Sequence, residues 1–533
     1  MELDRPDTGE ARANDELASL AGGVFDCLGN AFPVCCLSDE FHYFPQIVPP
    51  QGGWTGWDDF TPDKISEVTT RLSLAERAAG EISRKTGDAR IHADAETIGR
   101  MARTLREQLS EVRFHETQPT FHMTVLCTGL AASLKDLDPQ AWGVRAETVP
   151  SFLKQAEAAL VAMPRLFRDL GLEMIRDTEA WLQTLAREQD ELAPVFAALG
   201  RFGDFLRNAR TREDFLLPPE IVERIVKEHL GCGLGLDELR DAIKEEIAET
   251  GSLMNEAAET LLPGAGAREA IRRLPVPEVS ADGLTALYRK EADNLLGHCI
   301  ARGIVPEGLP VTNPLKVSPL PPYLRAIRAA SAYSFTPANP SQKGTFYIVP
   351  PEGPWNDNWE ELADWRMLTA HETYPGHHLL DAWRWHFVSP LRRPVENPLF
   401  YEGWACFAEE LMRETGYFSG PADALLLAKR RYRRAVRGLV DLDLQTGKLD
   451  QRAAARLLVE AGFPAEAAAS VVPKYALRPG YQVCYTFGLR RFLDLHRRYG
   501  KEDAKGFVEV VLSGGEIGFD LLEKSLHRRF DES

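Results

Sequence analysis

Long helical periodicity with few breaks is the feature that most limits what this chain can fold into. Between residues 66 and 260, apolar residues recur every three or four positions with charged residues between them, most regularly over 156–171 and 178–199. Glycine and proline, which interrupt helices, are sparse in this stretch. The pattern therefore predicts a mostly α body in which amphipathic helices pack on one another.

The composition of the sequence changes near the middle, where glycine and proline become frequent. Residues 262–282 contain PGAGAR and LPVPEVSADG, which are typical of turns and linkers. We therefore expect an N-terminal helical region over residues 1–275 and a second region over residues 276–533, joined as one continuous two-lobed body. No internal repeat or low-complexity tract divides the chain further.

The second region mixes helix with a small amount of strand. Residues 284–304 have helical periodicity, and residues 310–322 hold five prolines, too many for a helix interior. Residues 344–349 (GTFYIV) are aromatic and β-branched and are followed by proline, which favours a strand. Helical pattern resumes at residue 358, so we expect a small β-sheet within a helical protein.

Composition limits the partners of the chain. Its 533 residues include 62 Lys and Arg against 79 Asp and Glu, a net charge of −17, which repels nucleic-acid backbones and anionic membranes. No run of 18 apolar residues occurs, and the first 20 residues lack the apolar core of a signal peptide. The eight cysteines form no CxxC pair and are typical of reduced thiols. These features predict a cytoplasmic protein without nucleic-acid or membrane partners.

The segment HETYPGHH, residues 371–378, carries the clearest chemical signal. In the HExxH motif two histidines four residues apart hold zinc, and the glutamate between them acts as general base. Here His371 and Glu372 are followed by histidines six and seven positions on, His377 and His378. Seven residues of unbroken helix rise by about 10 Å, too far for one metal ion to bridge.

Two residues inside that segment remove the difficulty. Pro375 lacks a backbone donor and Gly376 adopts dihedral angles closed to other residues, so together they should break the helix. The chain can then bring one of the two later histidines back toward His371. Residues seven apart lie on the same face of a helix, which favours His378 for this role, and His377 remains the alternative.

A third ligand is available on a later helix. Asn397 and Pro398 form a good helix start, and Glu402 follows among apolar neighbours three and four residues away. A carboxylate in such a position has to be paired or bound to a cation, because bare burial of charge is costly. Two turns further on, Glu409 could orient a ligand histidine or could lie on a solvated face.

Three segments together resemble a known family. HETYPGHH, YEGWACFAEEL and PGYQVCYTFG are similar to the bacterial family called domain of unknown function 885, from about residue 310 to the C-terminus and less closely before it. That family is in turn similar to helical gluzincins such as thimet oligopeptidase, angiotensin-converting enzyme and the thermostable carboxypeptidases. The resemblance implies a helical gluzincin-like body with a deep cleft, a small β-sheet beside the active site, and bound Zn²⁺.

The resemblance also assigns roles to residues. It implies that His371, His377 and Glu402 bind the metal, whereas the helical-face argument alone prefers His378, so this choice stays open. It implies a transition-state tyrosine at Tyr485. The sequence departs from the family pattern at three positions, where Tyr481 replaces glutamine, Lys474 replaces arginine and Gln445 replaces histidine. The departures leave the metal residues intact and put the usual substrate pocket in doubt.

The predicted function is zinc-dependent hydrolysis of peptide bonds in short peptides. Glu372 would take a proton from a metal-activated water, and Tyr485 would bind the oxyanion of the tetrahedral intermediate. The strand at residues 344–349 would pair with an extended substrate. The alternatives are a zinc amidase acting on a non-peptide amide metabolite and a non-catalytic helical scaffold; the presence of Glu372 beside intact ligands argues against the scaffold.

Other polar residues have simpler interpretations. His115 begins a second His-Glu-Thr and His122 follows seven residues later, but no glycine precedes His122 and no suitable glutamate helix follows. We expect no metal there. The expected surface histidines are His386, His496 and His527. The arginine-rich run at residues 430–437 is expected to form a charged helix face, from which one arginine could hold a substrate carboxylate.

Overall fold

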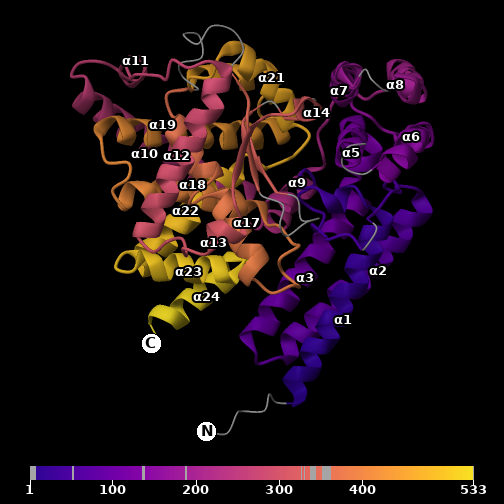
Figure 1. Ribbon diagram of the computed structural model, residues 1–533, viewed down its shortest axis with the longest axis horizontal. Helices are drawn as coiled ribbons and strands as arrows, with labels where there is room; N and C mark the ends of the chain where they lie inside the picture. Colours follow the sequence, from indigo (N-terminus) through magenta and orange to yellow (C-terminus); the bar gives the residue numbers. More distant parts are fainter. Residues whose placement is uncertain are drawn as a thin grey trace.

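The computed structural model describes residues 8–50, 53–134, 139–185, 189–325, 327–328, 330–335, 344–350 and 362–531. Helices make up most of this part of the chain, as the periodicity predicts. Figure 1 shows two lobes side by side, with the N-terminal half in indigo and magenta and the C-terminal half in orange and yellow. In the described part of the chain, no helix combines the length and the apolar character needed to cross a bilayer.

The N-terminal lobe is a group of helices around its own core. One cluster of buried apolar side chains, drawn mainly from residues 21–206, joins these helices. The lobe contains α1 (Thr8–Ala31), α2 (Pro62–Lys85), α3 (Ala89–Glu107), α4 (Phe114–Thr117), α5 (Pro119–Ala132), α6 (Pro139–Ala159), α7 (Arg165–Thr184) and α8 (Gln189–Asn208).

The C-terminal lobe has a second core, drawn mainly from residues 225–526. Its long helices pack in pairs, α10 along α19 and α18 along α22. It contains α9 (Pro219–Arg224), α10 (Leu236–Leu261), α11 (Ala267–Arg272), α12 (Ala281–Ala301), α13 (Leu309–Thr312), α16 (Trp365–Glu372), α17 (His377–Phe387), α18 (Pro398–Glu414), α19 (Pro421–Gln445), α20 (Gln451–Glu460), α21 (Ala465–Tyr475), α22 (Val483–Leu495), α23 (Ala504–Gly514) and α24 (Phe519–Phe530). The division into regions at residue 275 stays a prediction.

The helix predicted over residues 284–304 is confirmed as α12, but residues 156–171 do not form one helix. Helix α6 ends at Ala159 and α7 begins at Arg165. Pro164 lies between them, and proline disfavours helical dihedrals in the residue before it. The backbone there pairs instead with Arg212, whose N–H donates to the Met163 carbonyl over 3.1 Å. The stretch predicted over 178–199 spans the end of α7 and part of α8, and its residues 186–188 lie outside the described residues.

A three-stranded sheet lies in the C-terminal half. The strand predicted over residues 344–349 is confirmed as β3 (Thr345–Ile348), flanked by β1 (Lys316–Pro319) in parallel and β2 (Ala332–Ser334) in antiparallel pairing. Since β3 is the central strand, both of its edges are occupied, and the prediction that it pairs with substrate is wrong. On the outer edge of β2, the Tyr333 N–H donates to Glu372 over 2.7 Å and the Tyr333 carbonyl accepts from Arg328 over 3.1 Å.

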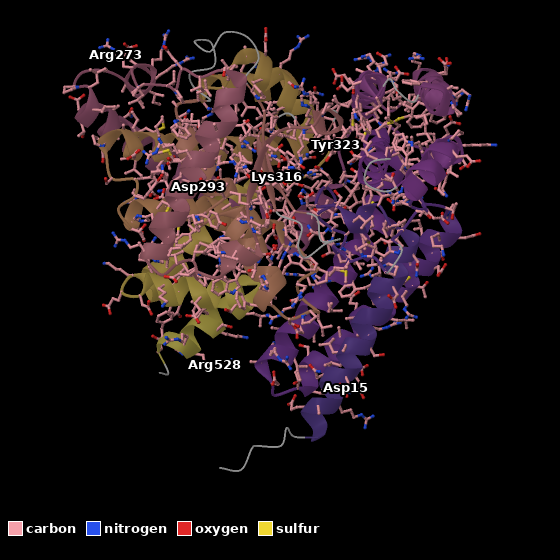
Figure 2. All side chains as sticks on the ribbon, viewed as in Figure 1. Asp15, Arg273, Asp293, Lys316, Tyr323 and Arg528 are labelled. Carbon is pink, nitrogen blue, oxygen red and sulfur yellow. The ribbon has the colours of Figure 1, made fainter. Side chains whose placement is uncertain are left out.

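Several contacts join the two lobes near the sheet. Helix α14 (Pro322–Arg325) contacts α5 and α7, and Tyr323, labelled near the junction in Figure 2, lies with its ring 5.9 Å from that of Trp181. Arg328 pairs with Glu40 of the N-terminal lobe over 2.5 Å. The ring of His42 stacks on Tyr481 at a centroid distance of 4.9 Å. Residues of the N-terminal lobe therefore reach the segment that precedes α22.

Candidate metal centre

The break in the HETYPGHH segment falls where the sequence predicts it. Helix α16 ends at Glu372 and α17 begins at His377. Between them, the Gly376 N–H donates to the Ala370 carbonyl over 3.1 Å, which folds the chain tightly against the end of α16. A Cβ atom on Gly376 would lie 1.9 Å from the His371 carbonyl oxygen, so only glycine fits. The Trp404 indole N–H holds the turn by donating to the Pro375 carbonyl over 2.9 Å.

Three buried side chains converge as a result of this fold. The Nε2 atoms of His371 and His377 each lie 3.6 Å from Oε2 of Glu402. All three ligand atoms lie within 4.8 Å of one another, and this is the metal-ligand cluster found among the described residues. The histidines are 4% exposed and Glu402 is 6% exposed, so these polar groups are withdrawn from solvent.

Helix α18 brings Glu402 to the histidines. Its start is capped as predicted, with the Asn397 side chain accepting hydrogen bonds from the N–H groups of Leu399 and Phe400. Gly403 faces Gly488 of α22, and a Cβ atom on Gly403 would lie 2.6 Å from the Gly488 backbone. Because two glycines meet at this crossing, α18 and α22 approach closely beside Glu402.

The surroundings of His371 orient its ring. Its Nδ1 lies 3.0 Å from Oε1 of Glu409, which in turn is bound by the guanidinium groups of Arg430 and Arg434. Burial alone would raise the pKa of the Glu409 carboxyl, but these two arginines hold it well below its usual range. A proton on Nδ1, donated to the Glu409 carboxylate, leaves the Nε2 lone pair directed at the cluster. Glu409 is buried against His371, so the predicted solvated face is wrong, and its role in orienting a ligand histidine stays a prediction.

The two candidate histidines differ in their contacts. Both nitrogens of His378 have partners away from the cluster, Nδ1 at 3.2 Å from the Tyr333 hydroxyl and Nε2 at 3.1 Å from the Asn313 carbonyl. His377 instead directs Nε2 to Glu402, and its ring stacks on Tyr401 at a centroid distance of 4.0 Å. The geometry therefore places His377 in the cluster and His378 outside it.

The residues expected to act on a substrate lie around the cluster. Glu372 is buried, and its Oε2 accepts the hydrogen bond from the backbone of Tyr333 in β2. The ring of Tyr485 lies parallel to that of His371, with centroids 6.4 Å apart. Burial and the neighbouring Glu402 carboxylate raise the pKa of Tyr485 well above its usual range, so its hydroxyl keeps its proton.

One contact was missed by reasoning from the sequence. The Tyr481 hydroxyl donates to Oε1 of Glu402 over 2.8 Å, which connects this residue directly to a proposed metal ligand. Tyr481 and Tyr485 are four residues apart, and their rings meet edge to face at 6.0 Å. This four-residue spacing was the signal in the sequence that both tyrosines could lie on the same side of the chain, next to the proposed ligands. Of the other departures, Gln445 is buried and donates to the Tyr475 carbonyl, whereas Lys474 is exposed.

Two interpretations of charged residues need correction. The run at residues 430–437 is not a solvated face, because Arg430 and Arg434 are committed to Glu409. Among the three histidines expected at the surface, His386 and His527 are exposed, but His496 is buried, with its ring packed against Phe407 and Phe507. His496 is next to basic residues in the sequence, which suggested a surface position, but its neighbours in space are apolar.

Fold and cluster together define a helical protein with a buried His-His-Glu cluster that could hold a metal ion. The family described as bacterial protein of unknown function, domain of unknown function 885, matches residues 57–526, and the chain belongs to that family. A comparison with curated proteins finds no match.

Two solved structures have the same overall fold. One is described as a lipoprotein of unknown function from Shewanella oneidensis, with a TM-score of 0.75 and 16% identity, covering 95% of this chain and 99% of that chain. The other is described as a lipoprotein from Colwellia psychrerythraea, with a TM-score of 0.78 and 16% identity, covering 98% and 100%. A carboxypeptidase from Pyrococcus furiosus aligns over 100% of this chain and 97% of that chain, but its TM-score of 0.40 and 11% identity are too low to indicate a shared fold or function.

Proposed function

We propose that this protein is a zinc-dependent hydrolase that cleaves peptide bonds in short peptides. The observation that carries the proposal is the convergence of two imidazole nitrogens on one carboxylate oxygen, each separated from it by 3.6 Å, in a buried site. Two histidines and a glutamate are the ligand set of one class of zinc hydrolases. The proposed likeness to the helical gluzincins rests on this set and on the sequence segments that carry it.

The three residues fit a zinc ion in two respects. At bond lengths of 2.0–2.2 Å, neighbouring ligand atoms of a tetrahedral zinc site lie about 3.3–3.6 Å apart, which matches both separations from Glu402. Oε2 of Glu402 is buried and has no hydrogen-bond donor among the described residues. A buried carboxylate oxygen without a donor is costly unless a cation binds it.

Each neighbouring residue has a proposed part in the reaction. Zinc held by His371, His377 and Glu402 would supply Lewis acidity, which activates water and polarises a substrate carbonyl. Glu372, positioned by the Tyr333 N–H, would accept a proton from water and pass it to the leaving amine. The protonated hydroxyl of Tyr485 would donate a hydrogen bond to the oxyanion of the tetrahedral intermediate.

Substrate pairing with the sheet is not part of the proposal. Both backbone groups on the outer edge of β2 at Tyr333 already have partners, Glu372 and Arg328. A substrate strand would have to break the contact that positions the proposed base. Recognition of the substrate therefore has to come from side chains around the cluster.

We also propose that the protein works in the cytoplasm. All eight cysteines are unpaired thiols, which suits a reducing compartment. The two proteins of similar fold are described as lipoproteins, so the compartment needs a direct test. Fractionation of the source cells, with detection by antibody, would place the chain; recovery in the membrane fraction would contradict the proposal.

Metal analysis combined with a peptide digest tests the main proposal. Elemental analysis of the purified protein should find about one zinc per chain, and His371→Ala and Glu402→Ala should lose it. A mixture of short peptides should be cleaved by the parent protein and not by either variant. Full zinc in Glu402→Ala would remove that residue from the site, and an uncleaved library with bound zinc would favour a non-catalytic role.

A further inference from the structure

Most arginines of the run at residues 430–437 have a carboxylate partner. Arg430 and Arg434 bind Glu409, and Arg431 binds Glu246 over 2.9 Å. This is expected in a chain whose acidic residues outnumber its basic ones by 79 to 62. An arginine of this run that faces the metal cluster without such a partner would therefore need another explanation.

Arg437 is an arginine of this kind. It is half-buried and lies over the ring of Tyr485, with its guanidinium carbon 4.8 Å from the ring centroid. Its Nε donates to the neutral Gln482 side chain over 2.9 Å, and the Tyr475 side chain also faces it. Among the described residues, no carboxylate oxygen lies within 4.0 Å of its nitrogens. Asp441 and Glu402 act on it only at longer range.

A second arginine flanks the other tyrosine. Arg478 is exposed, and its guanidinium carbon lies 6.0 Å from the ring centroid of Tyr481. Its Nη1 donates to Nε2 of His42 over 3.0 Å, and its Nη2 lies 3.3 Å from the Glu40 backbone carbonyl. The Glu40 carboxylate itself is bound by Arg328. The other nitrogen of His42, Nδ1, lies 2.7 Å from Oε1 of Glu396, and burial, followed by Arg478, lowers the pKa of His42 to about 3.

The two arginines therefore mark one side of the cluster. Tyr481 binds Glu402 and Tyr485 lies beside His371, so both tyrosines connect the metal ligands to a guanidinium group. Within the described part of the chain, neither guanidinium has an anionic partner within ion-pairing distance. Positive charge held at one wall of a site in an acidic protein attracts an anionic ligand to that wall.

We propose that the substrate carries a carboxylate, which Arg437 and Arg478 receive on the tyrosine side of the cluster. A guanidinium group binds a carboxylate through two parallel hydrogen bonds, which gives direction as well as affinity. The inference rests on the proposed peptidase function and narrows its substrate class. The carboxylate is either the C-terminus of the peptide or an acidic side chain, and both have the same chemistry.

Binding measurements with three matched ligands test the inference and separate the two sources. The protein is the full chain with the Glu372→Gln substitution, which should bind substrate without cleaving it. The ligands are an N-acetylated dipeptide with a free C-terminus, the same dipeptide as the C-terminal amide, and an amidated dipeptide with one glutamate. Calorimetry at fixed ionic strength gives Kd for each ligand, in the zinc-loaded and in the zinc-free protein.

At least one carboxylate ligand should bind about 10- to 100-fold more tightly than the neutral amide, the size of a charge-assisted contact. Arg437→Gln and Arg478→Gln, each added to this protein, should reduce the preference to roughly threefold or less, whereas Arg437→Lys should retain part of it. The matched control is Arg497→Gln, which alters an arginine with a 73% exposed side chain on the surface and should leave the preference unchanged.

Several outcomes would overturn the inference. They are equal affinity for all three ligands, no binding of any ligand, and a preference that survives in both Arg437→Gln and Arg478→Gln. Loss of the preference in Arg497→Gln as well would mean that net charge, not these arginines, sets the affinity. The ligand that shows the preference identifies the source as C-terminus or side chain.

The experiment also separates this inference from the proposed function. A carboxylate preference that persists in the zinc-free protein, together with no cleavage of any peptide, would keep the anion site and reject the peptidase. Cleavage of peptides with no difference between acid and amide forms would keep the peptidase and reject the anion site.

Discussion

The chain contains His-Glu-Thr twice, at His115 and at His371, and a further histidine follows each at seven residues. These later histidines, His122 and His378, behave alike. Each is buried and has Nε2 next to a backbone carbonyl oxygen, that of His115 over 2.8 Å and that of Asn313 over 3.1 Å. Burial lowers the pKa of each to about 4. The histidine seven residues after the first one, here called position seven, is therefore a neutral core residue in both segments.

The two segments differ at position six and in the acids around them. Position six is Phe121 in the first segment and His377 in the second. His115 lies among aromatic rings such as those of Phe60 and Phe114, and among the described residues its acidic contact is Glu116 at 3.6 Å. The second segment faces carboxylates from α18. A histidine motif therefore becomes a candidate metal site through the carboxylates that another helix brings to it.

The largest expected effect tests position six against position seven. His377→Ala should lose the metal completely, because it removes a proposed ligand, whereas His378→Ala should retain about one zinc per chain. Elemental analysis of both purified variants measures this, with His122→Ala as the control from the other segment. Loss of zinc from His378→Ala alone would mean that the helical-face argument was right.

The second expected effect compares the two glutamates that follow the first histidines. Glu372→Gln should keep zinc and the fold but lower turnover by about 10²- to 10⁴-fold, because an amide cannot accept a proton from water. The matched substitution Glu116→Gln should leave turnover unchanged. Peptide cleavage assays on both variants measure the difference. If Glu372→Gln cleaves peptides at the parent rate, the base lies elsewhere.

The third expected effect concerns a residue that only the second segment has beside it. Tyr485→Phe should lower turnover by about 10²- to 10³-fold, the size of one lost oxyanion donor, with zinc retained and KM nearly steady. Steady-state kinetics on a single peptide give both constants. A rise in KM with unchanged kcat would instead assign the hydroxyl to ground-state binding.

The smallest expected effect concerns stability and is tested on His122 of the first segment. The pKa of His122 is about 4 in the folded protein and about 6.5 in the unfolded chain, so only the unfolded chain gains the proton between these values. Its contribution to stability is therefore present above about pH 6.5 and is lost as pH falls toward 4, by up to about 1.4 kcal/mol per pH unit.

Denaturant unfolding at pH 7 and pH 5 measures this effect. His122→Asn cannot titrate in this range, so its loss of stability between the two pH values should be smaller than that of the parent protein. A variant whose stability changes with pH as steeply as the parent would show that His122 does not contribute to the acid sensitivity.

Local chemistry explains which parts of the site the sequence could predict. A proline followed by glycine, as at Pro375 and Gly376, interrupts a helix, and an asparagine before proline, as at Asn397, favours a helix start. The end of α16 and the start of α18 therefore follow from residues adjacent in the sequence. Glu402 was predictable because its neighbours at three and four residues are apolar. The strand β3 was predictable because its residues are aromatic and β-branched and a proline follows them.

The remaining contacts depend on helices that are far apart in the sequence. Arg434 reaches Glu409 from α19, and Tyr481 reaches Glu402 from the turn before α22. No periodicity in a single sequence encodes which helix faces which, so a run of arginines looked like a solvated surface. His496 was misplaced for the same reason, since its apolar neighbours come from other segments.

The stacking of His42 on Tyr481 has a consequence for how the protein can be divided. His42 belongs to the N-terminal lobe, and the tyrosine that it covers is hydrogen-bonded to Glu402. A fragment that began after α8 would keep every proposed ligand and still lose the imidazole ring that covers Tyr481. The half that carries the histidines and the glutamate is therefore not a minimal unit that could be cut out, fused or transplanted with its chemistry intact.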